Sequence, residues 1–273
     1  MAENILEFEK KPKPPGFIET ETALQFLQII HKAWERRWMA AMVGAPGLGK
    51  TKAMRRYCEL HPGHAFYYEF APSDASLSAM LDVLAGMLGA YAVDRGIHNK
   101  HRAVAHAIRR RAEQQIMESS NPSAVPDDDL VEATGRVVLL IDEAQELTPA
   151  ALQGLKALHD QTGVAIVLAG NETVINQFYA GKGMAKPAFA QLDRRIVLRR
   201  KVHGLVPADV AALARHHGIG GTKELSFLKR LASFGHGLAL PDNVIREARF
   251  AARNRPIGPC ELEEAARSLG VEL

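Results

Sequence analysis

The chain has 273 residues, of which 47% are hydrophobic, a composition that suits one sizeable domain plus a smaller one. Its net charge of +3 is mild and permits a polyanionic partner without requiring one. Two cysteines exclude a disulfide framework, and no apolar run approaches the roughly 20 residues that span a bilayer. Because the start also lacks the pattern of a signal peptide, we expect a cytoplasmic protein without membrane contact.

The first elements lead up to a glycine-rich loop. Residues 1–16 are basic and rich in proline and read as a flexible arm, after which Thr20 or Thr22 can cap a helix. An apolar run at 38–43 predicts a buried strand. A helix is expected from residue 51 into Cys58, after the loop that follows this strand.

The middle of the chain alternates strands with helices. Further apolar strands are expected at 65–70, 137–141 and 164–169, and helices are expected to begin at Ser73 or Asp74, near His101 and at Pro149. Residues 119–135 are polar and indicate a surface loop. Strands that are apolar throughout are typical of a parallel sheet covered by helices on both faces. The pattern therefore predicts an α/β fold.

Beyond residue 198 only helical patterns remain, with starts near 207, 223, 241 and 259. This change of character predicts a boundary near residue 201. We therefore expect an arm at 1–16, an α/β domain at 17–201 and a small helical domain at 202–273.

The glycine-rich loop matches the phosphate-binding pattern G-x-x-x-x-G-K-[ST] at every fixed position. Glycines allow successive backbone N–H groups to surround a polyphosphate, and the following helix presents its positive end to it. The lysine can reach the β- and γ-phosphates of ATP, and the threonine hydroxyl can bind Mg²⁺. A glycine-rich turn without a ligand is the alternative. The expected nucleotide-binding residues are Gly44, Ala45, Pro46, Gly47, Leu48, Gly49, Lys50 and Thr51.

Three polar residues follow the apolar strands that come later. Asp142 ends one strand and can hold Mg²⁺ through water, while Glu143 can orient an attacking water. Asn171 ends the next strand and could bridge the γ-phosphate and that water. Solvated strand ends and an asparagine that stabilises its own turn are the structural alternatives.

Two adjacent arginines precede the last apolar stretch. A guanidinium directed at a neighbouring subunit's γ-phosphate would stabilise charge in the transition state, and we assign this role to Arg195 because the apolar Ile196 follows it. Arg194 remains the alternative, and surface charge is the structural explanation for both.

Read in order, these residues resemble the AAA+ ATPases and, more narrowly, their DNA-transposition branch, the phage Mu B family. The loop 44–51 and Ile141-Asp142-Glu143-Ala144-Gln145 occur in many AAA+ proteins. The segment 155–174, which ends in Leu168-Ala169-Gly170-Asn171-Glu172-Thr173-Val174, is what favours the transposition branch. The likeness covers about residues 17–250. It implies a P-loop NTPase sheet flanked by helices and followed by an all-α lid.

The resemblance implies an ATP- and Mg²⁺-dependent ATPase, encoded by a phage or mobile element and acting in the bacterial host cytoplasm. Such proteins assemble as homo-oligomers, in rings or helical filaments, on double-stranded DNA without sequence preference. They recruit and activate a transposase, and hydrolysis releases them. Oligomerisation is therefore expected to activate the ATPase.

Two departures from the family's pattern affect DNA and nucleotide contacts. About 37 residues precede the first strand, too few for the family's helix-turn-helix domain, so DNA contact is expected from the ATPase domain or the arm. The lid also lacks an early nucleotide-sensing arginine, for which Arg246 is a weak substitute. The candidate DNA-binding residues are Lys100, Arg102, Arg109, Arg110, Arg111, Lys182 and Lys186, with a solvated helix face as the alternative.

Two other functions fit the same motifs. One is an AAA+ ATPase with a non-DNA client, of the secretion or signalling type. The other is a nucleotide-gated interaction module with little hydrolysis, against which Glu143 argues because a pure switch needs no water-orienting carboxylate.

Overall fold

The computed structural model describes residues 17–90, 96–119, 135–172, 179–180, 184–185, 190–202, 204–235, 237–253 and 256–272. The chain divides into two compact units. The sheet unit comprises Leu27–Val43 and Met54–Lys201, and the helical unit comprises Met1–Phe26, Gly44–Ala53 and Val202–Leu273. The glycine-rich loop therefore belongs to the same unit as the C-terminal helices.

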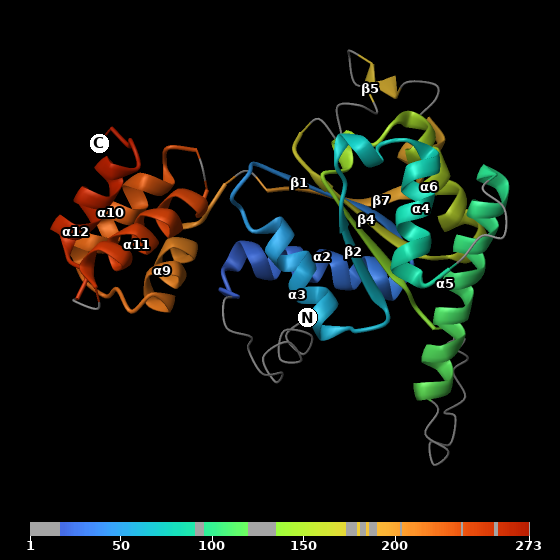
Figure 1. Cartoon of the computed structure of the whole chain (residues 1–273), viewed down its shortest axis with the longest axis horizontal. Helices are drawn as coiled ribbons and strands as arrows, with labels where there is room; N and C mark the ends of the chain where they lie inside the picture. The colour runs from blue at the N-terminus through green and yellow to red at the C-terminus, as the bar shows by residue number, and fades with distance from the viewer. Residues whose placement is uncertain are drawn as a thin grey trace. The chain divides into compact units, whose positions relative to one another are not determined.

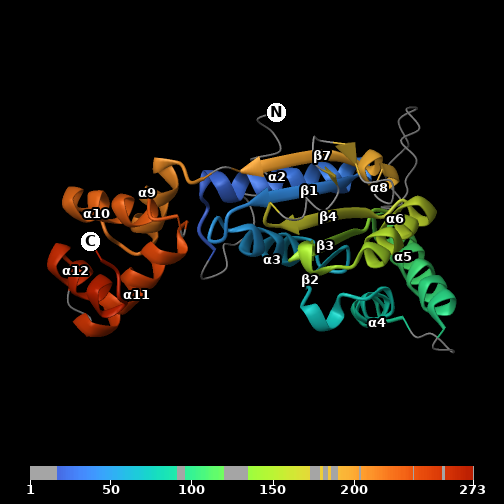
Figure 2. The ribbon, with the colours of Figure 1, turned by 90° about the horizontal axis from the view of Figure 1, so that it is seen from above.

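A five-stranded sheet in the order β2-β3-β4-β1-β7 forms the centre of the sheet unit (Figures 1 and 2). The pairs β2–β3, β3–β4 and β4–β1 are parallel. The strands are β1 (Met39–Gly44), β2 (Ala65–Glu69), β3 (Val138–Asp142), β4 (Ala165–Gly170) and β7 (Ile196–Val202). A separate antiparallel pair joins β5 (Tyr179–Ala180) to β6 (Met184–Ala185). The predicted α/β fold with a parallel sheet is confirmed.

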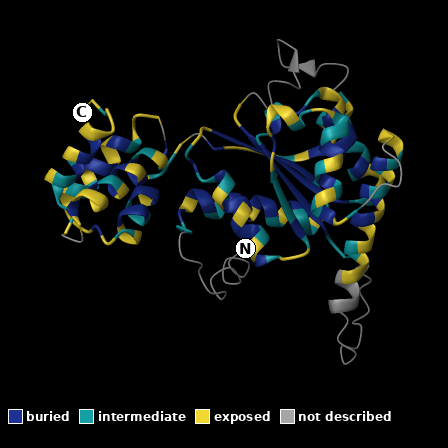
Figure 3. Cartoon of the chain, in the orientation of Figure 1, coloured by how far each residue is buried: buried dark blue, intermediate teal, exposed yellow. Residues whose placement is uncertain are grey.

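Helices cover both faces of this sheet. On one face, side chains of β1, β3 and β4 pack with α4 (Leu77–Leu88), α5 (Ile97–Ser119) and α6 (Pro149–Thr162) in a single apolar core. Figure 1 shows α3 (Lys50–Leu60) on the other side of the sheet. Every residue of β1, β3 and β4 is buried, and these strands are dark blue in Figure 3. Burial on both faces is why these strands are apolar throughout.

One helix begins later than expected. Residues Pro72–Asp74 form the short 3₁₀ helix η1, and the side chain that caps α4 is Ser76, whose Oγ accepts the Ala79 N–H at 3.2 Å. Asp74, one of the two expected caps, instead accepts a hydrogen bond from the Tyr68 hydroxyl at 2.9 Å. This contact with a residue six positions earlier, on β2, takes the carboxylate away from the helix start.

Strand β7 was not expected as a strand. It stands at the sheet edge, next to β1, and only its end residues Ile196 and Val202 are buried. An edge strand with exposed basic residues at 199–201 lacks the continuous apolar pattern by which the central strands are recognised.

The helical unit has its own apolar core. Four helices, α9 (Pro207–His216), α10 (Thr222–Ala232), α11 (Ala239–Ala252) and α12 (Pro259–Ser268), bury aliphatic side chains and Phe227 among themselves. The N-terminal turn of α2 (Glu21–Arg36) joins them, because the Thr22 hydroxyl and N–H both donate to the fully buried Asp209, at 2.5 and 3.2 Å. Thr20 caps this helix, its Oγ1 accepting the Ala23 N–H at 3.0 Å.

Candidate functional site

The glycine-rich loop leaves the carboxyl end of β1 and runs into α3. Gly47 and Gly49 have left-handed φ values of 80° and 89°, which only glycine adopts without strain. A Cβ added to Gly49 would meet no atom within 4 Å, so the backbone conformation alone demands glycine there. Two such residues just before a helix N-terminus form the kind of concave backbone that binds phosphate.

Lys50 is buried beneath this loop. Its Nζ donates to the carbonyl oxygens of Gly44 at 2.8 Å and Ala45 at 3.0 Å. Leu48 is also buried, whereas Ala45 and Pro46 are exposed. The lysine side chain therefore lies against its own loop with the ammonium group on backbone carbonyls. This arrangement of cationic side chain, glycine backbone and helix start fits a nucleotide's phosphates.

The acidic pair stands at the end of β3. Asp142 is fully buried, and its two carboxylate oxygens accept hydrogen bonds from the Tyr67 hydroxyl at 3.2 Å and from the Glu143 N–H at 3.0 Å. Glu143 has a left-handed φ of 51°, uncommon for a residue with a side chain. A carboxylate is the kind of acceptor that can hold the water shell of a Mg²⁺ ion.

Gln145 brings the two neighbouring strand ends together. Its side-chain amide donates to Glu143 Oε2, and its Oε1 accepts the backbone N–H of Asn171 at 3.4 Å. Glu143 and Asn171, predicted separately from two strands, thus share one partner. At the level of sequence, Gln145 stands out only as part of a motif shared with AAA+ proteins, and Tyr67 does not stand out.

The two candidate finger arginines have different surroundings at the end of α8 (Ala190–Arg195). Arg195 Nε donates to Asp160 Oδ1 at 2.7 Å, and Lys156 forms a second ion pair with Asp160 at 2.8 Å. Hydrogen bonds from Lys156 and then Arg195 lower the pKa of Asp160. Arg194 is exposed and forms no ion pair with any residue that the structure describes. The Arg195 guanidinium is thus held by an ion pair within its own chain.

The candidate DNA-binding residues on α5 are not equivalent. Lys100 is almost fully buried, and its Nζ donates to Asp82 at 2.6 Å and Ser78 at 2.9 Å. The Arg111 guanidinium lies 5.8 Å from the centre of the Phe66 ring. Arg102, Arg109 and Arg110 are exposed, although Arg109 donates to the Gln161 carbonyl oxygen at 3.0 Å. The candidates Lys182 and Lys186 lie outside the described residues.

The C-terminal helices contact the glycine-rich loop within the helical unit. The Leu238 N–H donates to the Gly47 carbonyl oxygen at 3.0 Å. Gly237 has a left-handed φ of 58°, and a Cβ there would come within 2.6 Å of the carbonyl carbon and oxygen of Gly47. The backbone before α11 therefore approaches the loop as closely as glycine permits.

Asp242 lies close to nitrogen atoms of three side chains beside this contact. Its carboxylate lies 2.8 Å from His217 Nε2, 3.0 Å from Arg246 Nη2 and 3.9 Å from Lys52 Nζ. The hydrogen bond with His217, reinforced by Arg246, lowers the pKa of Asp242 to about 2. Arg246, the weak candidate for a nucleotide-sensing arginine, is thus held by this carboxylate.

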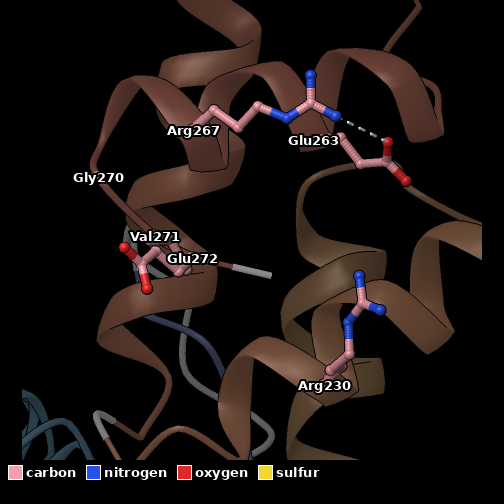
Figure 4. A pocket seen from close by; sticks show the side chains of 6 residues that line it. All are labelled: Arg230, Glu263, Arg267, Gly270, Val271 and Glu272. Carbon is pink, nitrogen blue, oxygen red and sulfur yellow. Dashed lines mark ion pairs between the residues drawn. The ribbon is translucent and has the colours of Figure 1, made fainter.

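A hollow of about 650 Å³ lies on the surface of the C-terminal helices (Figure 4). It is lined by Arg230, Glu263, Arg267, Gly270, Val271 and Glu272. Two arginines and two glutamates balance in charge, and Arg267 is paired with Glu263 at 3.8 Å. The hollow therefore selects no ligand by charge.

None of the described helices has the length and apolar character needed to cross a bilayer.

The family model of the AAA domain matches residues 35–178, a stretch that includes the glycine-rich loop, Asp142, Glu143 and Asn171. The chain belongs to the AAA domain family. It is an AAA+ ATPase of the transposition B-protein type. The family that the sequence motifs resembled is thereby confirmed.

Two sequence relatives and one solved structure are similar to this chain. The ATP-dependent target DNA activator B of Escherichia phage Mu is 29% identical over 96% of this chain and 76% of its own length. The Mu-like prophage FluMu DNA transposition protein B of Haemophilus influenzae is 26% identical over 83% of this chain and 70% of its own. The Thermotoga maritima RuvB Holliday junction branch migration motor matches in structure with a TM-score of 0.55 at 12% identity, over 97% of this chain and 74% of that one. This last likeness supports the fold alone.

Proposed function

We propose that this AAA+ ATPase binds target DNA in its ATP-bound form and there activates a transposase. The similarity to proteins named ATP-dependent target DNA activator B and DNA transposition protein B supports this function. It makes an ATPase with a secretion or signalling client the weaker explanation.

The nucleotide is proposed to bind on the glycine-rich loop. The observation that carries this proposal is the pairing of two left-handed glycines with a lysine folded beneath them at the start of α3. Residues 44–49 would surround the phosphates with backbone N–H groups, and Lys50 would move from its carbonyl partners to the β- and γ-phosphates. Thr51 and, through water, Asp142 would hold a Mg²⁺ ion. That ion would offset the phosphate charge when bound.

Hydrolysis is proposed to use the ends of β3 and β4. Strands β1, β3 and β4 belong to one parallel sheet, so their carboxyl ends, which carry the loop, Asp142 and Asn171, share one edge. Glu143 would orient the attacking water, and Asn171 would contact the γ-phosphate. The shared contact with Gln145 supports a common role for Glu143 and Asn171.

Oligomerisation is proposed to complete the site. Arg195, or Arg194 as the alternative, would supply a guanidinium to the nucleotide of the neighbouring subunit in a ring or filament, so that turnover rises on assembly. ATP binding and assembly are then linked reciprocally, because ATP binding changes the free energy of assembly and assembly changes the free energy of ATP binding by the same amount.

The division into an ATPase domain at 17–201 and a lid at 202–273 remains part of this proposal.

DNA binding is proposed to be electrostatic and non-specific. Of the residues predicted for it, Arg102 and Arg110 carry exposed charges on α5, whereas the charge of Lys100 is already paired with Asp82. The number of phosphate contacts would set the slope of affinity against salt.

The test has two parts. Glu143→Gln is expected to lower ATP turnover by roughly 10²-fold or more while nucleotide binding persists. Glu146→Gln, in the same short turn η2 (Ala144–Glu146), is the matched control and should leave turnover unchanged. Affinity for random duplex DNA, measured by fluorescence anisotropy over a salt series, should be higher with ATP than with ADP.

The outcomes separate the three functions. Absence of DNA binding in every nucleotide state would favour a non-DNA client. ATP binding without turnover in the presence of DNA and transposase would favour a nucleotide-gated module.

A further inference from the structure

Tyr67 lies in β2, beside the strand that ends in Asp142. The parallel register pairs Tyr67 with Leu140 and Glu69 with Asp142. Side chains two residues apart on a strand share a face, and paired residues of neighbouring strands point to the same side. Tyr67, Glu69 and Asp142 therefore project from one face of the sheet, and the tyrosine ring runs along it toward the strand ends.

The hydroxyl of Tyr67 meets two carboxylates. It lies 3.2 Å from Asp142 Oδ2 and 3.1 Å from Glu69 Oε2. A phenol has a single hydrogen and donates to one of them at a time. A tyrosine hydroxyl is protonated at neutral pH and is therefore available as a donor.

Arg55 contacts both Glu69 and the ring of Tyr67. Its guanidinium lies 3.2 Å from Glu69 Oε2 and 5.1 Å from the centre of the Tyr67 ring. Glu69 has a cationic partner and a half-exposed side chain, and Asp142 is fully buried with Oδ1 on the Glu143 N–H. A buried carboxylate gains more from a hydrogen-bond donor than an exposed, paired carboxylate does, because bulk water cannot solvate the buried group. Asp142 is the acceptor that benefits from the hydroxyl.

We infer that Tyr67 is a positioning residue for Asp142. Its hydroxyl fixes the carboxylate from Oδ2 while the Glu143 N–H fixes it from Oδ1, so the carboxylate keeps one orientation, in which it would hold the water shell of a Mg²⁺ ion. The inference rests on the proposed function, since it assigns Tyr67 a role only if Asp142 serves the metal. Partners of this kind tune metal sites without touching the metal.

Tyr67→Phe tests this role with a binding measurement. The Mg²⁺ concentration that half-saturates the binding of a fluorescent ATP analogue is expected to rise on the order of tenfold. Affinity for the same analogue in EDTA should stay within about twofold, because the glycine-rich loop is untouched. Tyr68→Phe is the matched control: its hydroxyl donates to Asp74 rather than to Asp142, so its Mg²⁺ dependence should equal that of the wild type.

Glu69→Ala provides a second variant on a half-exposed side chain. This variant leaves the Tyr67 hydroxyl with Asp142 as its remaining acceptor, so the Mg²⁺ concentration that half-saturates binding of the analogue should not rise. An unchanged midpoint in Tyr67→Phe would overturn the inference. Equal rises in Tyr67→Phe and Tyr68→Phe, or a rise in Glu69→Ala, would also overturn it, since a general disturbance of β2 would then suffice. A wild-type protein whose nucleotide binding ignores Mg²⁺ would instead refute the proposed metal site itself.

Discussion

The backbone N–H of Leu238 donates to the carbonyl oxygen of Gly47 at 3.0 Å, which joins the start of α11 to the glycine-rich loop. Gly237, one residue earlier, packs its Cα against the same peptide. Both contacts involve backbone atoms, so they depend on the path of the chain rather than on a particular side chain. A change of loop conformation on nucleotide binding would therefore reach the C-terminal helices directly.

Gly237→Ala is expected to weaken nucleotide binding by separating the loop from α11. The new Cβ would stand 2.6 Å from Gly47 and would also impose strain at a φ of 58°. Gly235→Ala is the matched control, because its φ of 90° gives a similar strain while its Cβ would meet no atom within 4 Å. Each change should cost about 1–3 kcal/mol of stability. Calorimetric titration with ATP should show reduced affinity in Gly237→Ala alone, and equal affinities would argue against a role for the contact.

Asp242 is expected to contribute to stability against acid. Its pKa falls from an ordinary 3.8 to about 2 in the fold, so it stabilises the native state at pH values above 3.8, and this contribution is lost as the pH falls through about 2. The shift corresponds to about 2 kcal/mol. Asp242→Asn should therefore be less stable than the wild type near pH 6, and the difference should shrink by pH 2. Urea unfolding at both pH values measures this, and a difference independent of pH would contradict it.

Arg195→Ala is expected to lower ATP turnover by about 10³-fold, and Arg194→Ala by much less. Mixing Arg195→Ala with Lys50→Ala should restore part of the activity, because some interfaces then combine an intact loop with an intact arginine. The same mixing experiment with Arg194→Ala serves as the comparison. Rescue of Arg194→Ala alone would transfer the role to that residue, consistent with the pairing of Arg195 to Asp160.

Arg102→Ala and Lys100→Ala form a matched pair for DNA binding on α5. Loss of the exposed Arg102 should weaken binding to all duplex sequences and reduce the slope of log affinity against log salt by about 1. Lys100→Ala should leave that slope unchanged, because its charge is already neutralised by Asp82. Anisotropy titrations over a salt series compare the two. Identical slopes in Arg102→Ala and wild type would remove this face of α5 from the DNA-binding surface.

Local pattern was sufficient to predict the central sheet and the glycine-rich loop. Strands β1, β3 and β4 are buried on both faces, so each is apolar along its whole length, and the loop's glycines are required by its backbone. The helix predicted to begin at Pro149 does begin there, and Thr148 caps it, because its Oγ1 accepts the Ala151 N–H at 3.3 Å.

Contacts between distant residues were beyond the sequence. Tyr67 and Asp142 are 75 residues apart and Thr22 and Asp209 are 187 apart, and neither spacing has a local pattern. The expected cap Asp74 instead contacts Tyr68, only six residues earlier, because the path of the chain after β2 places the two side chains together. Edge strand β7 escaped prediction because its outward residues are basic. What remained hidden was thus the set of partners that orient the predicted side chains.

The left-handed backbone at Glu143 implies a conflict between stability and activity. A φ of 51° is adopted by glycine at little cost and by asparagine more readily than by glutamate. A chain optimised for thermal resistance alone would therefore replace Glu143. Libraries screened for heat tolerance without an activity filter should accumulate substitutions at this position, and each would sacrifice the carboxylate proposed to orient water.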